Sequence, residues 1–269
     1  MIKRALLAII LLGLASLSLP RPSLAGEPDG RAIMDEVSRR HDADVETQTQ
    51  RMVLVESGGT TTERVLRRYA RKGADGLSRY LLVFDEPSGV RGVALLTWEK
   101  PGDNDQWTYL PALGNQLKRI AGGGRRNNFM GTDFAFEDLT IEDRDSFVYA
   151  RQPDEMLDGQ KAFVIDATPA KDSDSTSYER RRLHILQSNY MISRVEFFAK
   201  GNGRHIKTFV VEAMAPAGGQ RWHATRTSRE TRKDSHKTLT TTLSRSDASS
   251  DVPEEVFTHL YIQSKRHMR

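Results

Sequence analysis

Histidines and acidic residues are the side chains of this sequence that could bind a metal or transfer protons. The seven histidines are scattered, and no two lie four residues apart on an expected helix, the spacing that turns two imidazoles toward one metal. Asp133, Glu137 and Asp138 are clustered and could serve acid–base chemistry or a cation. Acids also gather at helix starts, where they cap free amides, and we favour that interpretation.

Nucleophile and nucleotide motifs are missing from the chain. It contains no G-x-S-x-G, H-E-x-x-H, S-x-x-K or P-loop pattern. It also has no cysteine, which excludes disulfides, a thiolate nucleophile and cysteine-bound zinc or iron–sulfur clusters. We therefore predict a protein that is not an enzyme, with no catalytic residue, no metal site and no cofactor.

A basic, glycine-rich stretch runs from Lys118 to Arg126 with the sequence KRIAGGGRR. Consecutive glycines allow backbone amides to point at an anion, and four cations flank them. A flexible, solvated hairpin is the competing interpretation. If the stretch does bind, Arg119, Arg125 and Arg126 are candidate contacts for an anionic headgroup or an acidic partner surface.

Aromatic residues concentrate between positions 80 and 136. On alternating strand positions such residues usually form a core, but together they could line an apolar cavity that binds acyl chains, at about 0.8 kcal/mol per buried CH₂. Which of these residues line a cavity depends on strand parity, that is, on the face of the sheet to which each side chain points. A slip of one residue in register turns each side chain to the other face. The candidate cavity or lid residues are Leu82, Phe84, Leu96, Trp107, Tyr109, Phe129, Met130, Phe134 and Phe136.

The elements that would position these residues are mainly strands. Helical spacing predicts a helix over 29–42 with Asp29 as its cap, and 251–260 is a candidate short terminal helix with Pro253 near its start. Residues 127–141 interrupt the alternation and are expected to form a loop leading into a short helix capped by Thr132 or Asp133. Alternation and turn residues predict strands near 47–57, 63–71, 79–85, 93–98, 106–110, 116–120, 146–151, 161–167, 178–186, 191–199, 204–213, 220–228 and 236–244. Such a meander of ten to thirteen antiparallel strands is expected to curl rather than stay flat.

The first 25 residues are typical of a secretory signal peptide. A basic start at Lys3 and Arg4 precedes an apolar run, and a small-x-small site ends at Ala25. The run is shorter than the 20 or so residues that span a bilayer, and no later segment is apolar enough, so we expect a soluble mature chain of one domain, 26–269. Removal of the signal peptide takes away three basic residues and lowers the net charge of the chain from +4 to +1, which argues against nucleic acid as a partner.

Four segments together resemble a known family. They are PSGVRGVALL at 87–96, DQWTYLPAL at 105–113, KRIAG at 118–122 and NFMGTDFAFEDL at 128–139, with further similarity over 178–207 and at Val252, Pro253 and Phe257. The chain resembles the LolA-like periplasmic proteins known as outer membrane lipoprotein-sorting proteins. The resemblance covers nearly all of residues 26–269 and is distant from LolA itself.

The resemblance implies an incomplete antiparallel β-barrel with short helices covering its open side, and a cavity that takes acyl chains of lipoproteins or lipids. It implies Tyr109–Pro111 and Phe129–Leu139 as rim and lid, with Arg91 or Arg119 as the arginine that holds the lid. It also implies partners: an inner-membrane transporter of the RND exporter type and an outer-membrane acceptor. The alternative is a sensor or adaptor that docks on an envelope protein, which a completely filled concave face would favour.

Overall fold

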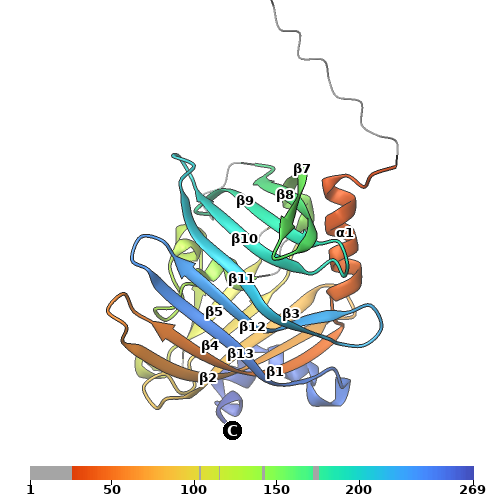
Figure 1. Ribbon diagram of the computed structural model, residues 1–269. Helices are drawn as coiled ribbons and strands as arrows, with labels where there is room; N and C mark the ends of the chain where they lie inside the picture. Colours follow the sequence, from red (N-terminus) through yellow and green to blue (C-terminus); the bar gives the residue numbers. More distant parts are fainter. Residues whose placement is uncertain (1–25, 103, 115, 141–142, 172–175) are drawn as a thin grey trace, which may run out of the picture.

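The protein is a single curved antiparallel sheet with thirteen strands among the described residues (Figure 1). This computed structural model describes residues 26–102, 104–114, 116–140, 143–171 and 176–269, so the expected signal peptide lies outside the described residues. The strands are β1 (Val45–Val55), β2 (Thr61–Lys72), β3 (Ser78–Glu86), β4 (Ala94–Trp98), β5 (Asp105–Tyr109), β6 (Leu117–Ile120), β7 (Phe147–Leu157), β8 (Gln160–Pro169), β9 (Tyr178–Leu186), β10 (Ile192–Ala199), β11 (His205–Pro216), β12 (Trp222–Thr231) and β13 (His236–Ser246).

Two meanders make up the sheet, in the order β6-β5-β4-β3-β2-β1-β13-β12-β11-β10-β9-β8-β7. They join at the centre, where β1 pairs with β13. The edges β6 and β7 do not pair with each other, so the sheet stays open. This confirms the expected incomplete barrel, and each predicted strand overlaps an observed one.

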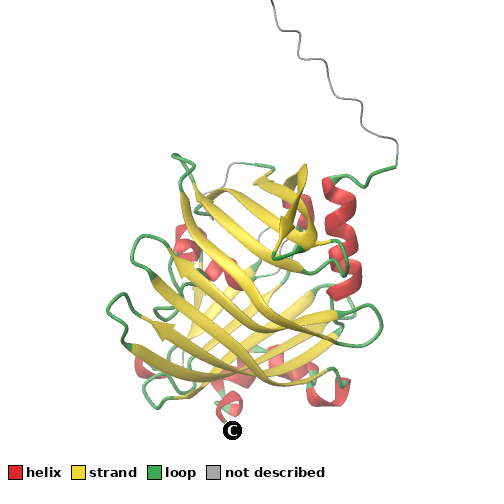
Figure 2. Ribbon diagram, in the orientation of Figure 1, coloured by secondary structure: helices red, strands yellow, loops and turns green. Residues whose placement is uncertain are grey.

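Helices are few and short (Figure 2). α1 (Gly30–His41) begins as predicted at Asp29, whose side chain accepts a hydrogen bond from the Ala32 amide at 2.8 Å. The predicted terminal helix is divided into η6 (Glu254–Phe257) and α2 (His259–Gln263), with Pro253 as the cap of η6. The remaining short helices are η1 (Pro111–Leu113), η2 (Gly122–Arg126), η3 (Phe136–Leu139), η4 (Arg144–Ser146), η5 (Ser249–Asp251) and η7 (Arg266–Met268). Among the described residues, no helix is both long and apolar enough to cross a membrane.

The chain passes from β6 at one edge of the sheet to β7 at the other. We name the first part of this connection, residues 121–140, the crossover segment. It contains η2 and η3 and packs against strands from the β1–β5 half, with Phe129 between Phe84 and Phe136. The helix η3 was expected to start at Thr132 or Asp133, and this is wrong. Ala135 is its cap position, and its amide donates to the Asp138 carboxylate at 2.8 Å.

Alternation along the strands separates two packing layers. Leu82 and Phe84 of β3 pack with the crossover segment, whereas Leu81 and Val83 turn to the opposite face. That face is covered by the C-terminal segment, residues 252–268, through apolar side chains such as Val256. Strands β3 and β4 are therefore buried on both faces.

The β7–β11 half is covered by α1. Ile33, Met34 and Val37 pack against apolar side chains of β8, β9 and β10. Gly30 permits this contact, because a Cβ at that position would lie 2.4 Å from the Tyr149 carbonyl oxygen.

Candidate functional site

The main cavity has a volume of about 830 Å³ and lies between α1, the crossover segment and strands β8 to β11. This volume is within the range of small-molecule binding sites. Part of its wall is apolar and comes from both α1 and the sheet: Met34, Val37, Phe147, Leu183, Ile192, Val195, Phe197 and Phe209. Charged residues also line the cavity, among them Asp138 of the crossover segment, Arg144 of η4, Arg180 and Arg181 of β9, and Arg229 of β12.

A second cavity of about 350 Å³ lies toward the β1–β4 half of the sheet. Its wall includes Met52, Leu82, Leu95, Phe134 and Leu139. The two cavities share four wall residues: Asp138, Thr140, Phe209 and Arg229. These four residues therefore lie in the partition, the part of the wall that the two cavities have in common.

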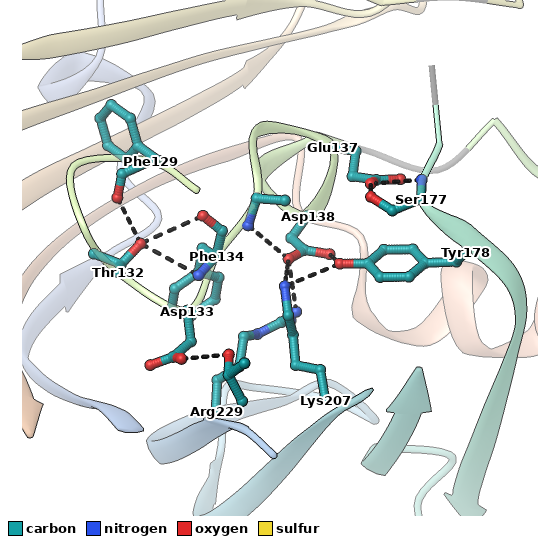
Figure 3. A network of polar contacts seen from close by, with 12 residues as sticks. Phe129, Thr132, Asp133, Phe134, Glu137, Asp138, Ser177, Tyr178, Lys207 and Arg229 are labelled. Atoms are coloured by element: carbon teal, nitrogen blue, oxygen red, sulfur yellow. Dashed lines mark hydrogen bonds and ion pairs between the residues drawn. The ribbon is translucent and has the colours of Figure 1, made fainter. Parts of the chain in front are cut away.

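Buried polar contacts fasten the crossover segment to the centre of the sheet (Figure 3). Asp133 is almost fully buried and accepts hydrogen bonds from Thr231 Oγ1 at 2.5 Å and Thr238 Oγ1 at 2.7 Å. Its carboxylate also lies 2.7 Å from His236 Nδ1. Arg64 of β2 donates a hydrogen bond to the carbonyl oxygen of Met130, in the crossover segment, at 2.7 Å.

Asp138 is the centre of a second buried cluster, at the partition between the cavities (Figure 3). Its carboxylate lies 3.1 Å from Lys207 Nζ and 2.9 Å from Arg229 Nη1. The Tyr178 hydroxyl donates to it at 3.0 Å and accepts from Lys207 at 3.0 Å. The cluster joins the crossover segment to β9, β11 and β12.

Burial and charge act in opposite directions on the pKa values of this cluster. Burial raises the pKa of Asp138, but the Arg229 and Lys207 cations outweigh it and hold that pKa below its ordinary value. Burial lowers the pKa of Lys207, with Asp138 opposing the shift. Burial also raises the pKa of Tyr178 well above its ordinary value, so its hydroxyl stays protonated and can donate.

Three aromatic rings surround the Arg229 guanidinium. The distances from Arg229 Cζ to the ring centres are 4.5 Å for Phe134, 4.7 Å for Phe197 and 5.2 Å for Phe209, within cation–π range. Two of these rings belong to the sheet and one to the crossover segment. The Arg229 side chain is thus held where the crossover segment meets the apolar wall of the main cavity.

Six of the nine predicted cavity residues lie in one cluster, with the crossover segment against the β1–β5 half: Leu82, Phe84, Phe129, Met130, Phe134 and Phe136. Leu82 and Phe134 line the second cavity, whereas Phe84 is fully buried in the core. A role in ligand binding stays a prediction for all nine.

The structure places Leu96, Trp107 and Tyr109 on the other face of the sheet, away from this cluster. They pack with the C-terminal segment, where the Trp107 ring lies 4.5 Å from that of His259. These three predicted residues therefore do not share a face with the other six, and their role in ligand binding stays a prediction. β4 is buried at its first four positions, including the polar Thr97, so burial does not mark which parity faces the crossover segment.

The four predicted arginines do not form one patch. Arg91 and Arg126 are exposed, Arg119 is exposed and pairs with Asp105, and Arg125 is buried and donates to the Asn104 carbonyl. Only Arg125 of the four lines the main cavity. Their role in contacting a headgroup or partner stays a prediction.

Sequence reasoning missed the main cavity and the Asp138 cluster. The cavity wall on β8 to β11 lies in strands that were predicted, but their inward residues were not singled out. Lys207 and Arg229 are 69 and 91 positions after Asp138, so only the sheet brings them together. In the described part of the chain, no group of three or more histidine or acidic side chains could hold a metal.

Comparison of the sequence with protein-family models assigns the chain to a family. A family model described as "-like: Uncharacterized protein" matches residues 76–264. No curated protein matches the sequence.

Several solved structures share the fold. A protein domain from Vibrio parahaemolyticus named for outer membrane lipoprotein sorting has 24% identity and a TM-score of 0.81, covering 87% of this chain and 98% of its own. A DUF1329 family protein from Desulfovibrio piger has 23% identity and a TM-score of 0.80, covering 87% and 97%. A LolA superfamily protein from Nitrosomonas europaea has 18% identity and a TM-score of 0.68, covering 86% and 98%.

Proposed function

The chain belongs to the uncharacterized family whose model matches residues 76–264 and has the fold of LolA-like outer membrane lipoprotein-sorting proteins, and we propose that it is a periplasmic carrier of acyl chains. In this proposal the signal peptide directs the chain to the periplasm. The carrier takes lipoproteins or lipids from an inner-membrane transporter, of the RND exporter type, and delivers them to an outer-membrane acceptor. The protein needs no cofactor for this task, because shielding a chain from water requires no chemistry.

The main cavity is the single observation that carries the proposal. Its volume of about 830 Å³ and its apolar side chains from α1 and β8 to β11 suit a flexible hydrocarbon chain. Each CH₂ group that leaves water for such a wall contributes about 0.8 kcal/mol. The apolar wall can therefore replace much of the free energy that a long acyl chain would lose on moving from a bilayer into water, without any directional contact.

A bulky substitution inside the main cavity tests the proposal. Ile192 lines the cavity and is half-buried, so Ile192→Trp should fill space rather than displace core, and should weaken uptake of a fluorescent fatty acid. Leu243→Trp on β13 is the matched control, because Leu243 is exposed and lines neither cavity. Wild-type protein from the periplasm should also carry a lipid in native mass spectrometry. Protein that is empty and refuses the probe would contradict the carrier.

A sensor or adaptor is the second candidate, and one observation favours it. The crossover segment packs against one face of the β1–β5 half, and the cavity described there is the smaller of the two. A protein of this kind would act through its outer surface and would co-purify with an envelope protein while remaining free of lipid.

A further inference from the structure

Arg229 is a buried cation with hydrogen-bonding capacity left over. Its side chain is only 8% exposed, yet among the described residues its Nε has no hydrogen-bond acceptor. Its Nη1 lies 2.9 Å from Asp138 without the alignment of a hydrogen bond. A buried donor without an acceptor is costly, so a ligand that supplies an oxygen there would recover that cost.

The charge around Arg229 also favours an anion. The Asp138 carboxylate is shared between two buried cations, Lys207 and Arg229. The neighbouring carboxylate of Glu137 already accepts hydrogen bonds from the Ser177 amide at 3.0 Å and its hydroxyl at 2.6 Å. Burying a cation is costly unless it is paired, so a second negative group at this point would lower the cost.

The position of Arg229 indicates what kind of molecule would bring that anion. The arginine lines both cavities, and apolar side chains continue on either side of it, such as Val195 in the main cavity and Leu82 in the second. A small soluble anion would leave those surfaces unoccupied. A molecule with a charged head and a hydrocarbon chain would contact both the guanidinium and the apolar wall.

We propose that the main cavity selects anionic amphiphiles, whose carboxylate or phosphate head binds Arg229 beside Lys207 while the acyl chain lies along Leu183, Val195 and Phe197. The proposal rests on the proposed carrier function and deepens it by naming the charge of the cargo. The planar guanidinium presents paired N–H groups that match carboxylate and phosphate oxygens. Uncharged acyl lipids would fit the apolar wall but would bring no negative charge to Arg229, so their hydrogen bonds there would be weaker.

The test compares lipids that differ only in the charge of the head. Binding of palmitate and hexadecanol, delivered from cyclodextrin, is measured by calorimetry on the mature wild-type protein. A second pair, dipalmitoyl phosphatidic acid and dipalmitoylglycerol, distinguishes a phosphate head from a carboxylate. In at least one pair the anionic member should bind about tenfold tighter or more, the size expected for hydrogen bonds to a charged group.

Two variants assign the preference to Arg229. Arg229→Gln should bind both members of the pair alike, whereas Arg226→Gln should keep the wild-type preference. Arg226 lies three residues earlier on β12, is 56% exposed and pairs with Glu212. Circular dichroism checks that both variants fold, and the wild-type pairs decide the question even if Arg229→Gln does not fold.

The outcomes separate the two proposals. Equal binding of charged and uncharged lipids to wild type would overturn the selection while the carrier function stands. A preference that persists in folded Arg229→Gln would overturn the assignment to this arginine. Binding of no lipid in either pair would overturn both proposals.

Discussion

Asp133 and His236 are 103 residues apart in the sequence, yet Asp133 Oδ2 lies 2.7 Å from His236 Nδ1. The pair joins the crossover segment to β13, which runs beside β1 at the centre of the sheet. Because Thr231 and Thr238 donate to the same carboxylate, one buried side chain satisfies three partners. The Asp133 carboxylate is thus one of the points at which the crossover segment is fastened to the sheet, beside Arg64 and the Asp138 cluster.

Asp133→Ala should lower the free energy of unfolding by about 3 kcal/mol, because the fully buried Thr238 hydroxyl and its neighbours lose their acceptor. Urea denaturation followed by circular dichroism measures the change. Asp145→Ala is the control: that side chain is 80% exposed in its ion pair with Arg31, so its loss should cost less than about 1 kcal/mol. Equal denaturation midpoints for Asp133→Ala and wild type would contradict the proposed fastening.

Asp138→Asn should cost about 3–5 kcal/mol at pH 7, since it leaves two buried cations without their carboxylate. The effect depends on pH. The pKa of Asp138 in the folded protein lies below its unfolded value of about 3.9, so its stabilisation is complete above about pH 5 and is lost as the pH falls through the folded pKa. Unfolding curves between pH 3 and pH 7, roughly the window set by these values, should show the difference between wild type and variant shrinking in acid. A constant difference would contradict a lowered pKa of Asp138 in the folded protein.

Gly30→Ala should destabilise the protein by about 1–3 kcal/mol, because the new methyl group meets the Tyr149 carbonyl oxygen and forces α1 away from β7. Thermal denaturation measures the effect. Gly58→Ala is matched to it, since a Cβ there contacts nothing within 4 Å and the position has no left-handed φ. Under the proposed function, Gly30→Ala should also weaken fatty-acid uptake, because α1 forms one wall of the main cavity.

Phe134→Ala and Trp107→Ala should behave differently, although the sequence suggested the same role for both. Phe134 lines the second cavity and touches the Arg229 guanidinium, so its loss should change lipid affinity. Trp107 packs against His259 on the opposite face, so its loss should lower stability and leave affinity unchanged in the folded protein. Probe titration together with thermal denaturation separates the two effects. Equal loss of affinity in both variants would contradict this division.

Periodicity was sufficient to predict the strands, since turn residues and alternating side chains mark each of them locally. It could not decide which face of a strand meets the crossover segment. In β3 and β4 both faces are buried, so polar residues do not distinguish Leu82 from Leu81 or Leu95 from Leu96. The C-terminal segment that covers the second face is more than 150 positions away in the sequence.

The candidate site was predictable only in part. The aromatic residues of the crossover segment drew attention to residues 129–136, which do pack inside the curved sheet. Lys207 and Arg229 looked like ordinary charged residues of solvated strands, because nothing adjacent to them in the sequence indicates burial. Their role follows from strand order, which places β11 and β12 beneath the crossover segment.

The pairing of β1 with β13 also determines the order in which the chain can fold. Among the described strands, every other neighbouring pair is consecutive in the sequence, so each meander can form from local contacts. The central pair, which aligns Thr47 with Ser246, must wait until almost the whole chain is available. Contacts between distant segments are slow to form. Until the last strand arrives, the first meander therefore keeps an unpaired strand edge at β1, and this interval is when the protein is most exposed to aggregation.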